Sequence, residues 1–357
     1  MVFKKSYLEK KLKFFKKNKL VKNILVVDGQ PGCGKTLFNR IFNSFENIEI
    51  FRYSSEIENI CSFYFHKKIS LDSAKFFLQT FADETLYSQM MGRNVNFRYS
   101  DLSSVFQSDK KYKYFKRIFS EGDEAIPEII NKKKPILHFA THNLLPRSEI
   151  LFKTFSYNLK FINIVRHPIY MVHQQAINHK EFIKNPARQL IQTFDFNKKE
   201  VPFFWEKDPK NYLKNLNPFE KAIVQIDRIN NINKKIETKI NKLYKKNFLK
   251  IPFETFVLNP DSHKLKIENF LEVKFDNKVY KTMKKEKVPR LKIIDGRSTK
   301  IYRKYGWTKG NMTLSENDEI NNKFNFILKQ NIKSENLELL KKISKDYEST
   351  FLKEVLN

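Results

Sequence analysis

The chain has 357 residues and a formal net charge of +29, because 68 Lys and Arg residues outnumber 39 Asp and Glu residues. Hydrophobic residues make up 41% of it, which is enough for a sizeable core and excludes a wholly disordered chain. Its two cysteines, Cys33 and Cys61, exclude a disulfide framework and favour a reducing, cytoplasmic setting. No apolar run approaches the roughly 20 residues of a membrane span, so none is expected.

The excess of basic residues is compatible with a nucleic-acid-binding protein. Only 12 of the 68 basic residues are arginine, the residue favoured for bidentate contacts to bases and phosphates. Lysine, asparagine, isoleucine and phenylalanine are all abundant, as a genome biased toward A+T would produce. The composition therefore favours a basic surface with no specific nucleic-acid partner, and a nucleic-acid-binding protein stays as an alternative.

Along the chain, short apolar strands alternate with helices. Residues 1–22, where lysine clusters alternate with Phe and Leu, are expected to form a basic helical segment rather than a secretory signal. Helices are also predicted from Leu37, over most of 55–132, over 218–245 and from Leu314 onward. Buried strands are predicted at four places, residues 23–28, 135–140, 161–165 and 248–252.

Such an alternation is typical of a parallel sheet covered on both faces. We therefore expect an α/β protein with a three-layer P-loop-type fold, a central parallel sheet and helical insertions. The main domain is predicted over residues 23–310, with insertions at about 55–132 and 175–245. Residues 311–357 are expected to add a C-terminal helical layer to the same domain.

The segment from Gly29 to Thr36, GQPGCGKT, matches the pattern G-x-x-x-x-G-K-[ST]. It follows a predicted strand and opens a predicted helix, which is the context that the pattern requires. In such a loop the glycines let backbone N–H groups turn toward a phosphate, and the helix N-terminus favours negative charge. Because Lys35 adds a mobile positive charge, the segment predicts a phosphate-binding loop.

A nucleoside triphosphatase with this loop would also need an apolar strand that ends in a magnesium-binding aspartate. The next two predicted strands in the chain are followed instead by His142 and by Arg166. Asp28 precedes the loop and could reach a metal only indirectly. No metal is therefore expected, although a P-loop kinase or ATPase that uses Mg-ATP at Gly29–Thr36 stays as the alternative.

The basic residues after the predicted strands point to a different kind of site. If the first three predicted strands are neighbours, Lys35, His142 and Arg166 meet at the carboxyl edge of one sheet, where open α/β sheets bind their ligands. Two permanent cations and an imidazole suit a substrate that carries several anionic groups of its own. Such a site needs no metal for charge neutralisation.

At four segments the sequence resembles the sulfotransferase family, whose members take a sulfuryl group from 3′-phosphoadenosine 5′-phosphosulfate (PAPS). The segments occur in the family's order and together extend over residues 23–272. They are similar, in turn, to the family's 5′-phosphosulfate loop, the segment with its catalytic base, its 3′-phosphate segment and its Y-E-D-L…D-P…F-L stretch. In this chain they are Pro31–Thr36, Thr141–Pro146, Phe161–Gln174 and Ile251–Leu271.

The resemblance implies a role for each matching residue. Lys35 would stabilise the bridging oxygen as it leaves, and His142 would take the proton from the hydroxyl or amine of the acceptor. The implied activity is in-line sulfuryl transfer from PAPS to a small-molecule or carbohydrate acceptor. The implied donor-binding residues are Gly32, Cys33, Gly34, Lys35, Thr36 and Leu37 for the 5′-phosphosulfate, and Arg166, Gln174 and Arg297 for the 3′-phosphate.

Two positions depart from the family pattern. The family loop has a basic residue where this chain has Gly32, and the family has a serine where this chain has Gln174. The family's C-terminal basic segment has a loose counterpart at Gly296–Lys300 or at Arg303-Lys304. No pattern identifies the acceptor, so carbohydrate, lipid, small phenol and peptide stay open.

Overall fold

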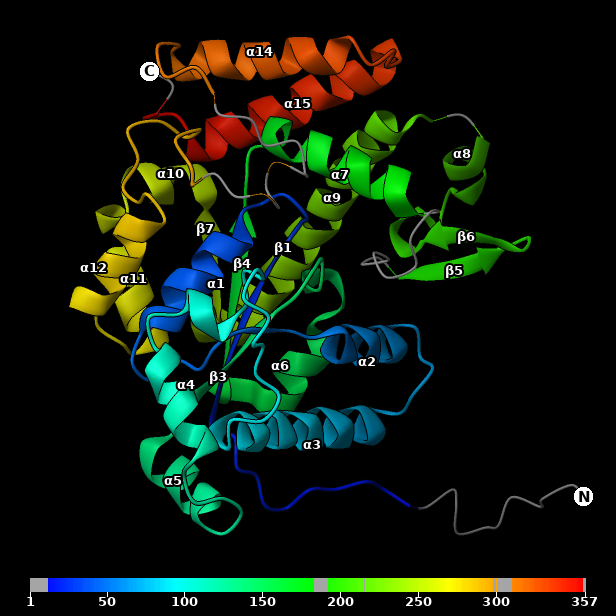
Figure 1. Cartoon of the computed structure of the whole chain (residues 1–357). Helices are drawn as coiled ribbons and strands as arrows, with labels where there is room; N and C mark the ends of the chain where they lie inside the picture. The colour runs from blue at the N-terminus through cyan, green and yellow to red at the C-terminus, as the bar shows by residue number, and fades with distance from the viewer. Residues whose placement is uncertain are drawn as a thin grey trace, which may run out of the picture.

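The computed structural model describes residues 12–182, 192–214, 216–297, 300, 303 and 310–355. Five parallel strands form the central sheet in the order β2-β3-β1-β4-β7 (Figure 1). They are β1 (Asn23–Gly29), β2 (Arg52–Tyr53), β3 (Ile136–Ala140), β4 (Leu159–Val165) and β7 (Phe248–Pro252). The four predicted strands are thus confirmed, and β2 is an additional edge strand, too short to show a pattern in the sequence.

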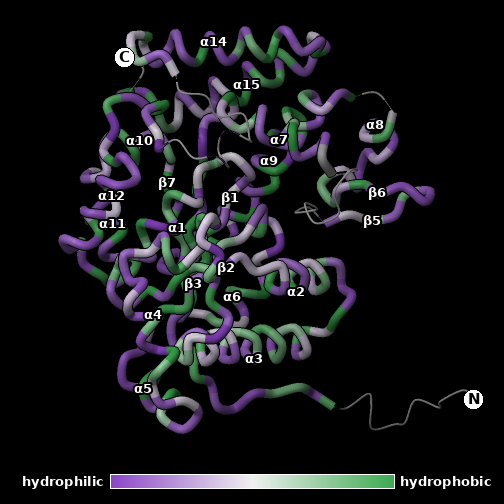
Figure 2. Tube along the Cα trace, in the orientation of Figure 1, coloured by the Kyte–Doolittle hydropathy of each residue, from purple (hydrophilic) through white to green (hydrophobic). Residues whose placement is uncertain are grey.

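The side chains of the central strand β1 divide the core into two halves. Ile24 and Val26 lie in one cluster of buried apolar side chains, whereas Leu25 and Val27 lie in the other, as the pleat of a strand requires. Figure 2 shows the apolar strands at the centre and more hydrophilic segments around them. The result is the expected α/β fold with a parallel sheet between two helical layers.

The helices of the two layers come from different parts of the chain. On the face of Ile24 lie α2 (Ser55–Phe65), α3 (Leu71–Met90), α5 (Ala125–Lys133) and α6 (Glu149–Phe155). On the face of Leu25 lie α1 (Lys35–Ser44), α7 (Ile169–Phe182), α9 (Pro218–Tyr244), α10 (Phe253–Leu258), α11 (Asp261–Leu271) and α12 (Asn277–Lys285). Two shorter helices, α4 (Lys111–Ile118) and α8 (Pro209–Lys214), lie outside these clusters. In the part of the chain that is described, no helix has the length and apolar character needed to cross a bilayer.

The C-terminal helices form a further layer at the top of Figure 1. They are α14 (Glu316–Leu328) and α15 (Ser334–Phe351), which confirms the helical prediction from Leu314 onward. Ile327, Leu340 and Ile343 of this layer pack in the same apolar cluster as side chains of α1 and α7.

Two segments differ from the expectation. Residues 12–22 contain no helix, because their backbone is held along α3, where the N–H groups of Leu20 and Val21 donate to Asp83 at 3.0 and 2.9 Å; residues 1–11 lie outside the described part. Within the second predicted helical insertion, β5 (Thr193–Phe196) and β6 (Lys199–Pro202) form an antiparallel hairpin. Its two-residue turn has positive φ at both positions, as tight hairpin turns require.

Candidate active site

The loop between β1 and α1 has the backbone geometry of an anion-binding turn. Gly32 and Gly34 have φ values of +90° and +88°, which disfavour any residue with a Cβ. A Cβ on Gly34 would lie 2.3 Å from the ring of Phe253, and one on Gly32 would lie 3.2 Å from Cα of Met171. The backbone at Gly32, where the family resemblance would place a basic residue, thus disfavours any side chain.

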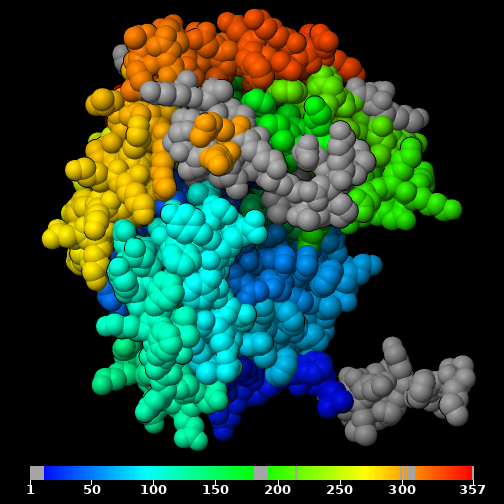
Figure 3. Space-filling view, viewed as in Figure 1, coloured from blue at the N-terminus to red at the C-terminus, as the bar shows by residue number. Residues whose placement is uncertain are grey.

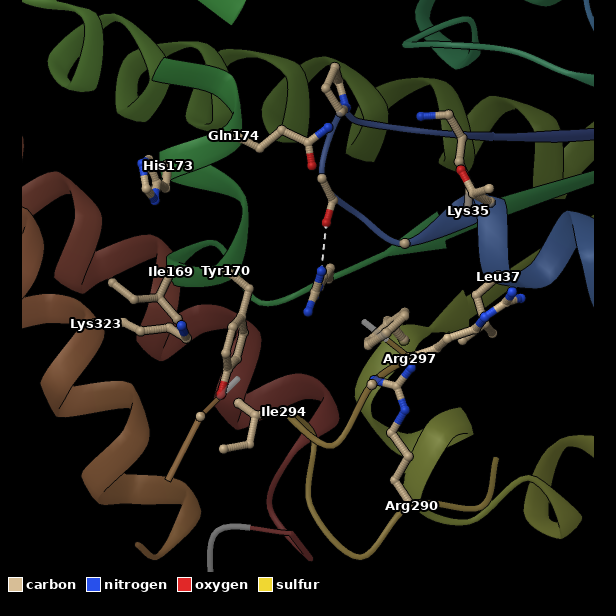
Figure 4. Close-up of a pocket in the computed structure, with 18 of the residues that line it drawn as sticks. Lys35, Leu37, Ile169, Tyr170, His173, Gln174, Arg290, Ile294, Arg297 and Lys323 are labelled. Carbon is tan, nitrogen blue, oxygen red and sulfur yellow. Dashed lines mark hydrogen bonds between the residues drawn. The ribbon is translucent and has the colours of Figure 1, made fainter. Parts of the chain in front are cut away.

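The carboxyl edge of the sheet opens into a cavity of about 920 Å³ (Figure 4). Lys35, His142 and Arg166 all line this cavity. Cys33 is an exception among the predicted residues, because it is buried in the loop, and burial raises the pKa of its thiol. The predicted residues that line the cavity are Gly32, Gly34, Lys35, Thr36, Leu37, His142, Arg166, Gln174 and Arg297.

Lys35 is the first residue of α1 and is held by the preceding loop. Its Nζ donates to the carbonyl oxygen of Gly29 at 3.2 Å, and the residue is 5% exposed. The helix has no side-chain cap at Gly34, so its N-terminal turn presents its positive end to the cavity. An ammonium group beside a helix N-terminus makes this wall suitable for a phosphate or sulfate group.

Arg166 follows β4, and its guanidinium group is fixed by several neighbours. Its Nη1 donates to the carbonyl oxygen of Gly32 at 2.9 Å. The guanidinium carbon lies 4.3 Å from the ring centre of Phe253 and 5.0 Å from that of Tyr170, and Nε is 3.8 Å from Glu254. Arg166 therefore braces the loop between β1 and α1, and its other N–H groups are suited to bind an anion.

Further cations surround the same cavity. Arg297 donates from Nη1 to Glu286 at 2.9 Å, and the guanidinium of Arg290 lies 5.3 Å from the ring centre of Phe253. Lys323 reaches the cavity from α14, opposite the arginines (Figure 4). The sequence predicts a site suited to a polyanion. Arg290 and Lys323 add two cations to its lining that no sequence pattern had singled out.

His142 follows β3, and its ring has two close partners, Glu58 behind the cavity and Tyr53 on its wall. Its Nδ1 lies 3.2 Å from Oε1 of Glu58 on α2, and the same oxygen accepts the backbone N–H of His142 at 2.7 Å. The ring also stacks on Tyr53, with ring centres 5.3 Å apart and planes at 18°. Since the hydroxyl of Tyr53 lies 3.0 Å from Oγ1 of Thr36, one aromatic ring connects the His142 loop to the phosphate loop.

Asp28 fixes the loop that carries His142. Its Oδ1 accepts from the hydroxyl of Thr141 at 3.0 Å, and its Oδ2 accepts the backbone N–H groups of Leu144 and Leu145 at 2.9 and 2.8 Å. The carboxyl group is buried, and burial raises its pKa although these hydrogen bonds oppose the shift. Both oxygens of Asp28 are thus used within the protein. Among the described residues, no group of three or more His, Cys, Asp or Glu side chains is placed to hold a metal ion.

Tyr53, Glu58 and α14 are the parts of this site that sequence reasoning missed. Tyr53 lies in a strand of two residues, and Glu58 is one of two glutamates in the first turn of its helix, so neither has a local pattern. The segment of α14 was expected only as an outer layer, yet it lines the cavity with Glu319, Asn322, Lys323, Phe326 and Ile327. Of the predicted C-terminal basic segment, residues 298–299 and 304 lie outside the described residues.

The first predicted helical insertion also reaches the cavity. The loop before α4 lines it with Asp101, Leu102 and Ser103. These three residues are far in the sequence from the other residues of the site. In Figure 3 the cyan part of the chain, which contains this loop, covers the face below the C-terminal layer. Asn178 of α7 lines the same cavity.

No protein-family model matches this chain, and no curated protein matches it. Its structure is similar to the sulfotransferase domain from the curacin biosynthetic pathway, with a TM-score of 0.42 and 14% identity over 91% of this chain and 98% of that one. It is also similar to sulfotransferase STF9 from Mycobacterium avium (TM-score 0.40, 11% identity, 95% and 79% of the two chains). A third similar structure is mouse sulfotransferase SULT7A1 complexed with PAP (TM-score 0.35, 12% identity, 92% and 90%). Each of these three solved structures, similar to the chain over most of its length, is a sulfotransferase.

Proposed function

We propose that this chain is an enzyme that transfers a sulfuryl group from PAPS to a hydroxyl or amine of an acceptor molecule. The observation that carries the proposal is the meeting of Lys35, Arg166 and His142 on one cavity, beside the N-terminus of α1. Two permanent cations and a helix N-terminus suit a donor with anionic groups at both its 5′ and its 3′ end. The imidazole beside them is suited to act as the base for the acceptor.

In this proposal the donor lies along the phosphate loop. Backbone N–H groups of Gly32–Leu37 bind the 5′-phosphosulfate, and Nζ of Lys35 leaves the Gly29 carbonyl to contact the oxygen that bridges phosphorus and sulfur. Arg166 and Gln174, which both lie against Gly32 of the loop, bind the 3′-phosphate together with Arg297. Gln174 can donate through its amide where the family has a hydroxyl.

The transfer step is a single in-line displacement at sulfur. The acceptor oxygen or nitrogen forms a bond to sulfur while the bond from sulfur to the bridging oxygen breaks. Nε2 of His142 takes the acceptor's proton, and adenosine 3′,5′-bisphosphate leaves with the electron pair of the broken bond. Lys35 stabilises the negative charge that develops on that leaving oxygen.

Calorimetric titration of the full chain with adenosine 3′,5′-bisphosphate, with and without magnesium, tests the donor site. We expect binding that does not need magnesium and that weakens about 10- to 100-fold in Lys35→Ala and in Arg166→Ala, because each change removes a charge-assisted hydrogen bond of about 1.5–3 kcal/mol. Lys153→Ala is the matched control, since Lys153 pairs with Glu149 and does not line the cavity. Binding that both site variants leave unchanged would refute the proposed donor site.

One observation favours a second candidate, a P-loop kinase or ATPase. Lys35 and Thr36 stand in the order of a nucleoside triphosphate-binding loop, at the start of a helix that follows a strand. This candidate predicts tight ATP binding that requires magnesium and no preference for a 3′-phosphate. A nucleic-acid-binding protein would instead show salt-sensitive binding that survives Lys35→Ala.

A further inference from the structure

Glu58 contacts the His142 ring at Nδ1, and the same ring lines the cavity. His142 lines the cavity, whereas Glu58 lies behind it on α2, 84 positions earlier in the chain. The two side chains are 16% and 12% exposed, so the contact between Nδ1 and Oε1 is largely shielded from water. A carboxylate can only accept a hydrogen bond, and this contact therefore requires the proton on Nδ1.

Two additional contacts restrict how the ring can turn. Oε1 of Glu58 also accepts the backbone N–H of His142, which fixes the carboxylate relative to the residue it holds. Tyr53 stacks on one face of the ring at an interplanar angle of 18°, and its hydroxyl is tied to Thr36. With Nδ1 engaged and one face covered, Nε2 is the ring nitrogen left for a ligand in the cavity.

We propose that Glu58 is a positioning residue for His142, which keeps the ring proton on Nδ1 and leaves the lone pair of Nε2 directed at the acceptor. The inference deepens the proposed function and rests on it for the role of His142 as a base. Before transfer, Nδ1 carries the proton and Nε2 is free. When the acceptor's proton arrives at Nε2, the imidazolium that forms lies beside the carboxylate of Glu58, which stabilises it until solvent removes the proton.

The ring nitrogens of His142 give a test that does not depend on turnover. In full-length protein labelled with 15N-histidine, at about pH 8 where an ordinary imidazole is neutral, ring 15N shifts report which nitrogen carries the proton. The His142 signals are assigned by their loss in His142→Ala. We expect Nδ1–H in the wild type, and loss of this preference in Glu58→Ala.

Two variants separate the hydrogen bond from general damage to the helix. Glu58→Gln keeps an acceptor oxygen in the same place and should retain the proton on Nδ1. Glu56→Ala is the matched control on the same helix, because Glu56 contacts Arg52 and Ser54 rather than His142. Unchanged affinity for adenosine 3′,5′-bisphosphate in all three variants shows that the phosphate loop is intact.

The outcomes distinguish this inference from the proposed function. A wild-type ring with its proton on Nε2, or an Nδ1 proton that persists in Glu58→Ala, would overturn the role of Glu58, whatever the enzyme does. With an acceptor that the wild type sulfates, Glu58→Ala should lower kcat about 10- to 100-fold, part of the general-base contribution, and leave KM for PAPS unchanged. If the wild type transfers no sulfuryl group, the proposed function fails while the ring measurement still decides whether Glu58 sets the tautomer.

Discussion

Asp28 offers a prediction that connects the fold to the placement of His142. This buried carboxylate accepts three hydrogen bonds from the loop after β3, one from a hydroxyl and two from backbone N–H groups. The perturbation is a graded series. Asp28→Ala removes both acceptor oxygens, Asp28→Asn replaces the carboxylate by an amide of the same shape, and Thr141→Val removes one of the three donors.

The expected losses of stability follow from the number of groups left without a partner. Asp28→Ala leaves three donors unpaired, and at about 1 kcal/mol or more for each buried group the free energy of unfolding should fall by roughly 3–5 kcal/mol. The loss of free energy of unfolding should lie near the lower end of this range. Burial raises the pKa of the Asp28 carboxyl, which means that its charged form is costly there, and the variant removes this cost. Thr141→Val should cost about 1 kcal/mol.

Asp28→Asn discriminates hydrogen bonding from charge. Its Oδ1 can accept both backbone N–H groups, and its NH2 can donate to Thr141, whose hydroxyl then acts as the acceptor. All three contacts survive without a buried charge, so the change in stability should stay within about 1 kcal/mol of the wild type. Urea unfolding followed by circular dichroism measures the series. If Asp28→Asn is as unstable as Asp28→Ala, or if Asp28→Ala unfolds at the wild-type urea concentration, the hydrogen-bond account is refuted.

Two other features give predictions of the same kind. Burial lowers the pKa of His138 to about 3, so between pH 6.5 and 3 the unfolded chain takes up a proton that the folded chain excludes, and stability falls as the pH drops. The part of this fall due to His138 is about 2 kcal/mol between pH 7 and 5, and urea titrations should find it missing in His138→Gln, which can still donate to Asn39. Gly34→Ala should lose about 2–4 kcal/mol and its affinity for adenosine 3′,5′-bisphosphate, because it combines a left-handed backbone with a contact at 2.3 Å to Phe253. In Gly122→Ala the new Cβ would meet only the end of a flexible side chain, so equal effects of the two changes would contradict this reasoning.

The sequence predicts most of the sheet because its strands are buried on both faces. A strand buried on both faces needs apolar residues at successive positions, as in β1 between residues 23 and 28. Such a run can be recognised from the strand's own residues. The hairpin at 193–202 has no such run, since its strands pack on only a small cluster around Trp205. Residues 12–22 look helical by composition, but tertiary hydrogen bonds to Asp83 determine their conformation.

The candidate site divides in the same way. The phosphate loop is predictable because its glycines and Lys35 stand next to one another and their geometry is local. The partners of His142 are not predictable in this way, because Glu58 and Tyr53 approach it from other elements only after the sheet and α2 are in place. Lys323 is a similar case, because an amphipathic helix pattern shows that one face of α14 is buried without showing what that face meets.

The charge of +29 has a different meaning once individual cations have their neighbours. Arg297 and Lys323 lie against Glu286 and Glu319, at 2.9 and 3.3 Å, so part of their charge is already balanced within the protein. Lys35, in contrast, donates to a backbone carbonyl, and Asp28, the carboxyl with which its charge interacts, is already bound by the loop after β3 and has a pKa that burial raises. An anion that reaches the phosphate loop can replace that carbonyl and gain a full opposite charge in a shielded place, where electrostatic attraction is stronger than at the surface. In the proposed function, selectivity for a small polyanion thus depends on how a few cations near the loop are paired, and the large total charge contributes mainly to the rate at which anions approach.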